Sequence, residues 1–166
     1  MTIRPETPHD YHAIENVHIA AFANHPYSRQ TEHLIVNALR ADHAVSVSLV
    51  AETAGEIVGH IAFSPLKING HDCRWFLLGP VGVLPSHQRR GIGQALIREG
   101  IKAIRSLGAE GTVLVGDPAY YSRLGFIHSP GLVVEGVPAK NVMCLPMTEQ
   151  IPCGDVSHHA AFWVTA

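Results

Sequence analysis

The chain has 166 residues, a length that predicts one domain rather than two. Hydrophobic residues make up 46% of it and charged residues 16%, which excludes a disordered segment and predicts a sizeable core. Lysine and arginine total 12 against 14 for aspartate and glutamate, so the chain lacks the overall basic field of a nucleic-acid-binding protein. We therefore expect no nucleic-acid partner and expect any bound anion to be held locally.

The sequence also argues against membrane, disulfide and metal-binding classes. No apolar run approaches the roughly 18–20 residues of a membrane span, and the first residues lack the apolar core of a signal peptide. We therefore expect a soluble, cytoplasmic protein with no membrane partner. Cys73, Cys144 and Cys153 are widely separated and form no Cys-x-x-Cys pair, so we expect reduced thiols. Of the 12 histidines only His158 and His159 are adjacent, and no His-Glu-x-x-His motif occurs, so we expect no metal.

Apolar side chains recur at helical spacing over residues 10–23, with Asp10 as a candidate N-cap. The spacing returns around residues 34–39, where Ser28 or Thr31 could cap a second helix. Residues 44–52 alternate apolar and small polar side chains and lead through a short turn into residues 57–66. This pattern predicts a strand hairpin.

The Asn69-Gly70 pair predicts another tight turn, followed by a long strand over residues 73–83. Gly79 and Pro80 lie inside that strand. Proline cannot donate to a ladder and glycine often marks a bulge, so we expect disrupted pairing near Pro80. The backbone groups released there would be free for another partner.

Helical spacing resumes over residues 91–107, with Gly108 as a candidate C-terminal cap. The apolar run 112–115 predicts a short strand buried on both faces, and residues 116–125 predict another helical segment. Residues 143–147 and 161–164 are predicted late strands. Together the elements predict one α/β domain with a mixed sheet.

The segment from Val81 to Leu96 runs from a strand through a short basic loop directly into the longest helix. A helix N-terminus leaves up to four backbone N–H groups unpaired and carries about half a positive charge, so it can bind phosphate oxygens. Gly91 and Gly93 remove Cβ atoms that would block approach, and the adjacent arginines add positive charge. We interpret the segment as a pyrophosphate cradle; a capped helix with a glycine turn and two solvated arginines is the alternative.

Two other nucleotide-binding loops do not fit this segment. The sequence Gly-x-x-x-x-Gly-Lys-Ser/Thr of a phosphate loop is absent. A dinucleotide-binding loop has a third glycine where Leu96 stands, and an acidic residue after the next strand, whereas Glu110 precedes it.

Two motifs resemble those of the GCN5-related N-acetyltransferases (GNAT). The family signature Gln/Arg-x-x-Gly-x-Gly/Ala, between the fourth strand and its helix, is matched by Gln88-Arg89-Arg90-Gly91-Ile92-Gly93. A later motif, an aromatic-Tyr pair followed by three residues and Gly-Phe, resembles the stretch from Gly116 to Phe126. The resemblance covers residues 2–147 and, with the tail ending at Phe162, is similar to a bacterial subgroup of predicted N-acetyltransferases.

The resemblance implies one GNAT domain over residues 1–166, with a core at 2–147 and an extension at 148–166. It implies a mixed, mostly antiparallel sheet flanked by helices, in which strands four and five splay apart and the pantetheine arm of acetyl-CoA lies between them. Val81 is then near the acetyl carbonyl, and Val83 directs the arm. The cofactor-binding residues that the resemblance implies are Val81, Val83, Arg89, Arg90, Gly91, Ile92, Gly93, Gln94, Asp117 and Tyr121.

Acetyl transfer to an amine needs a neutral amine and a proton for the leaving thiolate. Tyr121 stands at the position where many family members place a phenol beside the CoA sulfur, and a phenol holds its proton at pH 7. We predict that Tyr121 is the general acid; an ordinary core aromatic is the alternative. Tyr120 could face the core or line the acyl pocket. Asp117 stands where the family often has an asparagine on the cofactor arm, and it equally fits a helix N-cap.

No residue stands out as a general base, because residues 77–81 contain no carboxylate. Glu52, His60, His158 and His159 are candidates, and a water chain would need no dedicated residue. The resemblance implies that the loop at residues 24–29 borders the acceptor pocket.

Two functions fit these observations. The first is an acetyl-CoA-dependent N-acetyltransferase acting by direct attack in a ternary complex on a small-molecule amine or a protein amino group. The second is a non-catalytic acyl-CoA-binding sensor or partner module. Tyr121 distinguishes them, because a binding module needs no acid beside the sulfur. Dimers are common in the family, so the resemblance also implies a homodimer.

Overall fold

The computed structural model describes residues 1–165, and within them nine strands form one sheet. The strands are β1 (Thr2–Pro5), β2 (Val47–Thr53), β3 (Glu56–Ile68), β4 (His71–Val83), β5 (Gly111–Val115), β6 (Ile127–His128), β7 (Leu132–Val134), β8 (Val142–Pro146) and β9 (Gly154–His158). Their main order is β1-β2-β3-β4-β5-β8-β6, and β9 pairs with both β3 and β7. The β4–β5 and β7–β9 pairs are parallel and the others antiparallel, which confirms the mixed, mostly antiparallel sheet.

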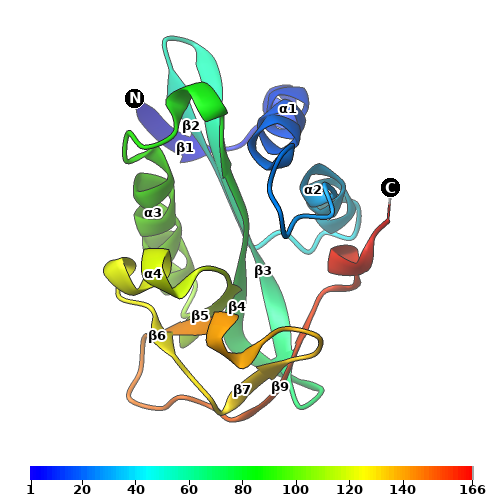
Figure 1. Ribbon diagram of the computed structural model, residues 1–166, viewed down its shortest axis with the longest axis vertical. Coiled ribbons are helices and arrows are strands. Elements are labelled where there is room, and N and C mark those ends of the chain that lie inside the picture. The colour runs from blue at the N-terminus through cyan, green and yellow to red at the C-terminus, as the bar shows by residue number, and fades with distance from the viewer. Residues whose placement is uncertain (166) are drawn as a thin grey trace.

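Helices cover both faces of the sheet. They are α1 (Tyr11–Phe22), α2 (Glu32–Ala41), α3 (Ile92–Ser106) and α4 (Pro118–Tyr121), with 3-10 turns at Pro8–Asp10, Pro85–His87, Ser122–Leu124, Ala139–Asn141 and Ala160–Trp163. Figure 1 shows α1 and α2 on one side of the long strands β3 and β4, and α3 and α4 on the other. The sheet therefore separates two layers of core.

The apolar stripe of α3 forms the larger part of that core. Leu96, Ile97 and Ile104 are buried against the sheet together with Phe63 of β3. Gly100 lies where the helix crosses Phe63, and a Cβ built on it would come 2.3 Å from the phenylalanine ring. The missing side chain thus sets how closely α3 approaches β3.

The predicted disruption of β4 is present. Ile61 of β3 pairs with Val81 and Phe63 pairs with Leu78, so the register shifts across the Gly79-Pro80 segment. Toward its other neighbour, β4 pairs with β5 only from Trp75 to Leu77. The last two residues of β5 pair with β8 alone, so strands four and five separate as expected.

Two predictions about elements are wrong. Residues 161–164 are not a strand: His159 Nδ1 accepts a hydrogen bond from the Ala161 amide (3.0 Å), and a 3-10 turn follows. Its apolar residues pack against α2 instead of joining the sheet. Asp10 stands at the N-cap position of α1 but does not cap the helix with its side chain, because its carboxylate accepts hydrogen bonds from Thr7 and Arg4 and so closes the 3-10 turn before the helix.

Neither residue predicted to cap α2 makes a side-chain hydrogen bond to the helix backbone. Thr31 occupies the N-cap position but makes no side-chain cap bond, and Ser28 hydrogen-bonds Glu32 within the first turn instead. Among residues 1–165, no helix combines the length and the apolar character needed to cross a membrane.

Candidate functional site

The outer edge of β4 presents unpaired backbone at the predicted position. The Leu84 amide donates to the Val58 carbonyl of β3 (2.9 Å). Because backbone groups alternate in direction along a strand, those of Gly82 face β3, while those of Val81 and Val83 face the β5 side. Within the described residues no strand pairs with them there, and only Gln88 Nε2 reaches this edge, donating to the Val83 carbonyl (3.0 Å).

The predicted cradle follows immediately. Gly91 is the N-cap of α3, with a φ of 81° that favours glycine, and its carbonyl accepts the amide of Ala95. Residues 92–94 form the first turn, and across residues 1–165 their amides find no acceptor. Arg89 and Arg90 are exposed beside them and form no ion pair with any other described side chain. The geometry is that of an open anion site.

Tyr121 packs into the side of α4 that faces the core. A Cβ on Gly116 would come 2.5 Å from the Tyr121 ring, and the ring meets Phe126 edge-on with centroids 5.8 Å apart. Burial, with the neighbouring Tyr120 and Asp117, raises the pKa of Tyr121 to about 12. The hydroxyl therefore keeps its proton near neutral pH.

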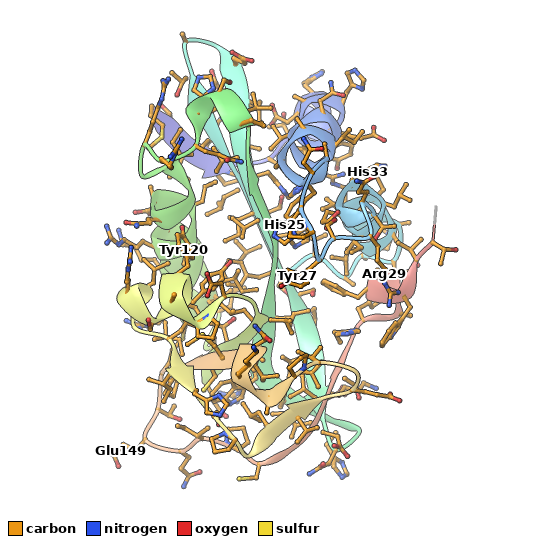
Figure 2. The ribbon with its side chains drawn as sticks, viewed as in Figure 1. His25, Tyr27, Arg29, His33, Tyr120 and Glu149 are labelled. Carbon is orange, nitrogen blue, oxygen red and sulfur yellow. The ribbon has the colours of Figure 1, made fainter. Side chains whose placement is uncertain are left out.

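Tyr120 connects α4 to the cradle. A Cβ on Gly93 would lie 3.4 Å from Tyr120 Oη and 3.8 Å from Val83 Cγ2. Three segments therefore meet here: the end of β4, the first turn of α3 and the tyrosine pair of α4. Tyr120 is labelled in Figure 2. Burial raises the pKa of Tyr120. From the sequence Tyr120 could face the core or line the acyl pocket; in the structure its hydroxyl lies beside the N-terminus of α3.

Asp117 acts as a helix cap. Its Oδ1 accepts the amide of Ala119 (3.0 Å), and Pro118 occupies the first helical position. The capping interpretation is therefore confirmed. A contact between Asp117 and a cofactor stays a prediction.

The four candidate bases are far from equivalent. Glu52 is in an ion pair with an N-terminal arginine (2.9 Å). His158 packs against the aromatic side chains of the C-terminal 3-10 turn, and His159 caps that turn. His60 alone lies next to this part of β4, because it is the register partner of Gly82 on the strand that pairs with the opposite edge.

His60 belongs to a buried hydrogen-bonded chain that sequence analysis missed. Its Nδ1 lies 2.8 Å from Nε2 of His18 on α1, and its Nε2 lies 2.7 Å from Oγ of Ser48 on β2. Both rings are fully buried, and burial lowers the pKa of each, so both are neutral at pH 7. The signal in the sequence is a histidine, His18, at a position of the otherwise apolar stripe of the first helix.

A carboxylate lies at the far end of this chain. Glu6 Oε2 is 3.6 Å from His60 Nε2, and both Glu6 oxygens accept hydrogen bonds from Arg40 (2.9 and 2.7 Å). Burial alone would raise the pKa of Glu6, but hydrogen bonds from Arg40, His60 and Ser48 outweigh it and lower the pKa to about 2. Glu6 is therefore ionised at neutral pH.

Other surface regions show fewer features of a binding or catalytic site. Two surface hollows lie elsewhere, one beside the salt-bridged Arg4, Asp10 and Glu52, the other between β1 and α3. Among residues 1–165, no three histidine, cysteine or acidic side chains gather to hold a metal ion. The candidate site is thus the open β4 edge with the adjoining ends of α3 and α4.

Comparison with known proteins gives consistent matches. Residues 44–128 match the sequence model described as an acetyltransferase (GNAT) domain. The chain is 33% identical over 127 residues to the uncharacterized N-acetyltransferase YhbS of Escherichia coli strain K12, a match that covers 76% of this chain and 73% of that protein.

Solved structures agree. The chain is similar to a GNAT family acetyltransferase from Brucella melitensis in complex with acetyl-CoA, with 47% identity, a TM-score of 0.87 and 97% of both chains covered. It is also similar to Escherichia coli YhbS in complex with CoA, with 28% identity and a TM-score of 0.90, covering 99% of this chain and 93% of that chain.

Proposed function

Because the chain belongs to the GNAT acetyltransferase family, we propose that it transfers the acetyl group of acetyl-CoA to a primary amine by direct attack in a ternary complex. One observation carries the proposal: an unpaired stretch of β4 backbone lies directly beside the bare N-terminus of α3. The unpaired β4 backbone can hydrogen-bond the amides of a pantetheine arm, and the N-terminus of α3 can bind a pyrophosphate. The similar structures that contain acetyl-CoA or CoA support it.

The proposed contacts follow from this geometry. The outward backbone groups of Val81 and Val83 hydrogen-bond the arm, and the first-turn amides of α3 hold the pyrophosphate, with arginine charge beside them. Asp117 uses the carboxylate oxygen that does not cap α4. The proposed cofactor-binding residues are Val81, Val83, Arg89, Arg90, Gly91, Ile92, Gly93, Gln94, Asp117 and Tyr121.

Tyr121 acts as general acid in this proposal. The amine nitrogen bonds to the carbonyl carbon, the C–S bond then breaks, and Tyr121 Oη supplies a proton to the sulfur. Its pKa of about 12 exceeds that of a free thiol, about 8.5, so complete proton transfer from the phenol to sulfur is uphill even once the C–S bond has broken. Tyr121 therefore acts as a hydrogen-bond donor whose proton moves as charge develops on sulfur.

Calorimetric titration with acetyl-CoA, with NAD and ATP as controls, tests the binding half of the proposal. We expect micromolar binding of acetyl-CoA and none of the controls. The catalytic half is tested by release of CoA thiol with three probes: spermidine, an aminoglycoside, and a peptide with a free N-terminus and one lysine. These probes separate small-molecule from protein-type acceptors.

Replacing the proposed acid separates an enzyme from a sensor. Tyr121→Phe should lower kcat about 100-fold and leave the acetyl-CoA Kd within about twofold, because only the proton is removed. Tyr11→Phe, on α1 and away from the site, is the matched control and should retain full turnover. Normal transfer by Tyr121→Phe would rule out its role, and binding without turnover of any probe by the wild type would favour the acyl-CoA sensor.

A further inference from the structure

We propose that His18 is the proton acceptor for the attacking amine, backed by a buried relay of His60, Ser48 and Glu6. The inference rests on the proposed acetyl transfer and supplies the base that sequence analysis did not identify. It starts from one atom: Nδ1 of His18 is completely buried and has no hydrogen-bond partner among the described residues. Buried polar atoms are nearly always hydrogen-bonded, so this one requires an explanation.

That atom lies against the strand that carries the proposed cofactor contacts. A Cβ on Gly82 would lie 3.0 Å from His18 Nδ1, and 3.3 Å from the adjacent ring carbon. The histidine ring therefore lies directly against the β4 backbone, between Val81 and Val83, because Gly82 has no side chain. The outward groups of those two valines are the proposed contacts of the pantetheine arm.

The hydrogen-bonded chain decides which nitrogen of His18 is free to accept a proton. Glu6 is ionised and can only accept, so it favours the His60 tautomer with hydrogen on Nε2, the nitrogen that faces Glu6 and Ser48. His60 Nδ1 then carries a lone pair and accepts from His18 Nε2 (2.8 Å). His18 is left with an unprotonated Nδ1, the form that a base requires.

The proton balance is as follows. The lone pair of the neutral amine forms the bond to the carbonyl carbon while the C=O π pair moves to oxygen. An N–H bond then breaks, leaving its electron pair on nitrogen and its proton on His18 Nδ1. The C=O bond re-forms as the C–S bond breaks and its pair leaves on sulfur. The positive charge then shared by His18 and His60 is balanced by Glu6. Tyr121 gives its own proton to the sulfur, and after release of the amide and CoA, His18 loses a proton to solvent while Tyr121 regains one.

The amine has an approach to this ring from the end of α1. Phe22, the last residue of α1, stacks on His18 with ring centroids 6.1 Å apart. The loop that follows carries His25 and Tyr27, which Figure 2 shows on this side of the sheet. In this proposal the amine enters past that loop and meets Nδ1 directly or through one water, which requires the side chains that cover Nδ1 to move aside.

The charged and titratable groups around His18 come from several elements, and most of them disfavour a proton on its ring. His60 of β3 and the α2 residues His33 and Arg40 each disfavour a proton on His18, as does burial. Glu6, after β1, is the counter-charge and acts through His60. Removing the Glu6 charge should therefore weaken the base without touching the substrate.

The tautomer is tested first, by ring 15N–1H NMR of histidine-labelled protein, with His18 assigned by loss of its signals in His18→Gln. At pH 7.5 we expect hydrogen on His18 Nε2 and none on Nδ1. Hydrogen on Nδ1, or on both nitrogens, would overturn the proposal. This measurement needs no acceptor, so it decides the point even if no amine is turned over.

Kinetics then separate a base from a packing residue, using the first of the three amine probes to show turnover. His18→Gln should lower kcat at least tenfold at pH 7 with acetyl-CoA Kd unchanged, and the deficit should shrink as pH rises because hydroxide can take the proton in place of the missing base. Glu6→Gln should show the same trend more weakly. The control is His12→Gln, exposed on the same helix, with wild-type rates.

A deficit of the same size at every pH would assign His18 a purely structural role and sink the proposal. If the wild type does not bind acetyl-CoA, the proposed function is contradicted instead. Failure of the base proposal and failure of the proposed function are therefore distinguishable. Thermal melts of each variant show whether it is folded in the assay.

Discussion

Two glycines at the N-terminus of α3 have different roles, although both belong to one motif. At Gly91 a Cβ would meet nothing within 4 Å, but the φ of 81° strains any other residue. At Gly93 no left-handed φ is required, and a Cβ would instead point toward Tyr120 Oη. One glycine therefore shapes the backbone, and the other keeps space open beside the proposed phosphate site.

These roles predict that an alanine substitution affects stability at Gly91 and acetyl-CoA binding at Gly93. Gly91→Ala should lower the free energy of unfolding by about 1 kcal/mol. Gly93→Ala should leave it within about 1 kcal/mol of wild type and weaken acetyl-CoA binding about tenfold, because its methyl group crowds the phosphates. Urea unfolding and calorimetry measure the two quantities. Equal acetyl-CoA affinity for Gly93→Ala and wild type would contradict the proposed cradle.

Single residues were predictable from sequence only where a motif named them. The glycines, arginines and Tyr121 belong to two local stretches whose order the chain preserves, so sequence placed them on the right elements. The His18–His60 pair joins positions 42 residues apart on a helix and a strand. No local spacing records such a pairing, and a buried histidine at helical spacing looks like core.

At the scale of elements, long periodic segments were predictable and short ones were not. The strands β6 and β7 have two and three residues, too few to show an alternating pattern. The strand β9 lies in a segment we had treated as an extension, yet it pairs with β3 and β7. Tertiary contacts, rather than local propensity, define these strands.

The position of β9 predicts that the extension contributes to stability. Val156 of β9 is 6% exposed and packs in a cluster with residues of β3 and β7, whereas Val133 of the neighbouring β7 is 52% exposed. Val156→Ala should lower the free energy of unfolding by about 1–3 kcal/mol, and Val133→Ala by less than about 0.5. Equilibrium urea unfolding compares them; equal, small effects would show that β9 is an appendage to an independently stable core.

At the scale of the whole molecule, buried ionisable groups tie the N-terminal segment to the sheet and to both helices beside it. Asp10 is bonded to Arg4, which holds the pKa of that carboxyl well below its usual range. Glu6 joins Arg40 of α2 to the histidine pair between α1 and β3. The same network therefore serves packing and, in our proposal, proton transfer.

The pKa directions fix how stability should depend on pH. Burial depresses the pKa of His18 and His60, so their contribution is complete above about 6.5, their usual value, and declines as pH falls below it. Glu6 has a folded-state pKa of about 2 against 4.5 for a free carboxyl, so its contribution is complete above pH 4.5 and is lost as pH falls toward 2. Acid should thus weaken the fold in two stages.

Glu6→Gln isolates the second stage. At pH 7 it should lower the free energy of unfolding by about 3 kcal/mol, because Arg40, whose side chain is 12% exposed, loses its partner. As pH falls from 4.5 to 2 the wild type should lose this advantage and the two curves converge. Glu99→Gln, which removes an exposed pair with Lys102, is the control and should follow the wild type throughout. Parallel curves for Glu6→Gln and wild type, measured by urea unfolding from pH 7 to pH 2, would mean that Glu6 titrates normally in the folded protein and that its ion pair with Arg40 does not stabilise the fold.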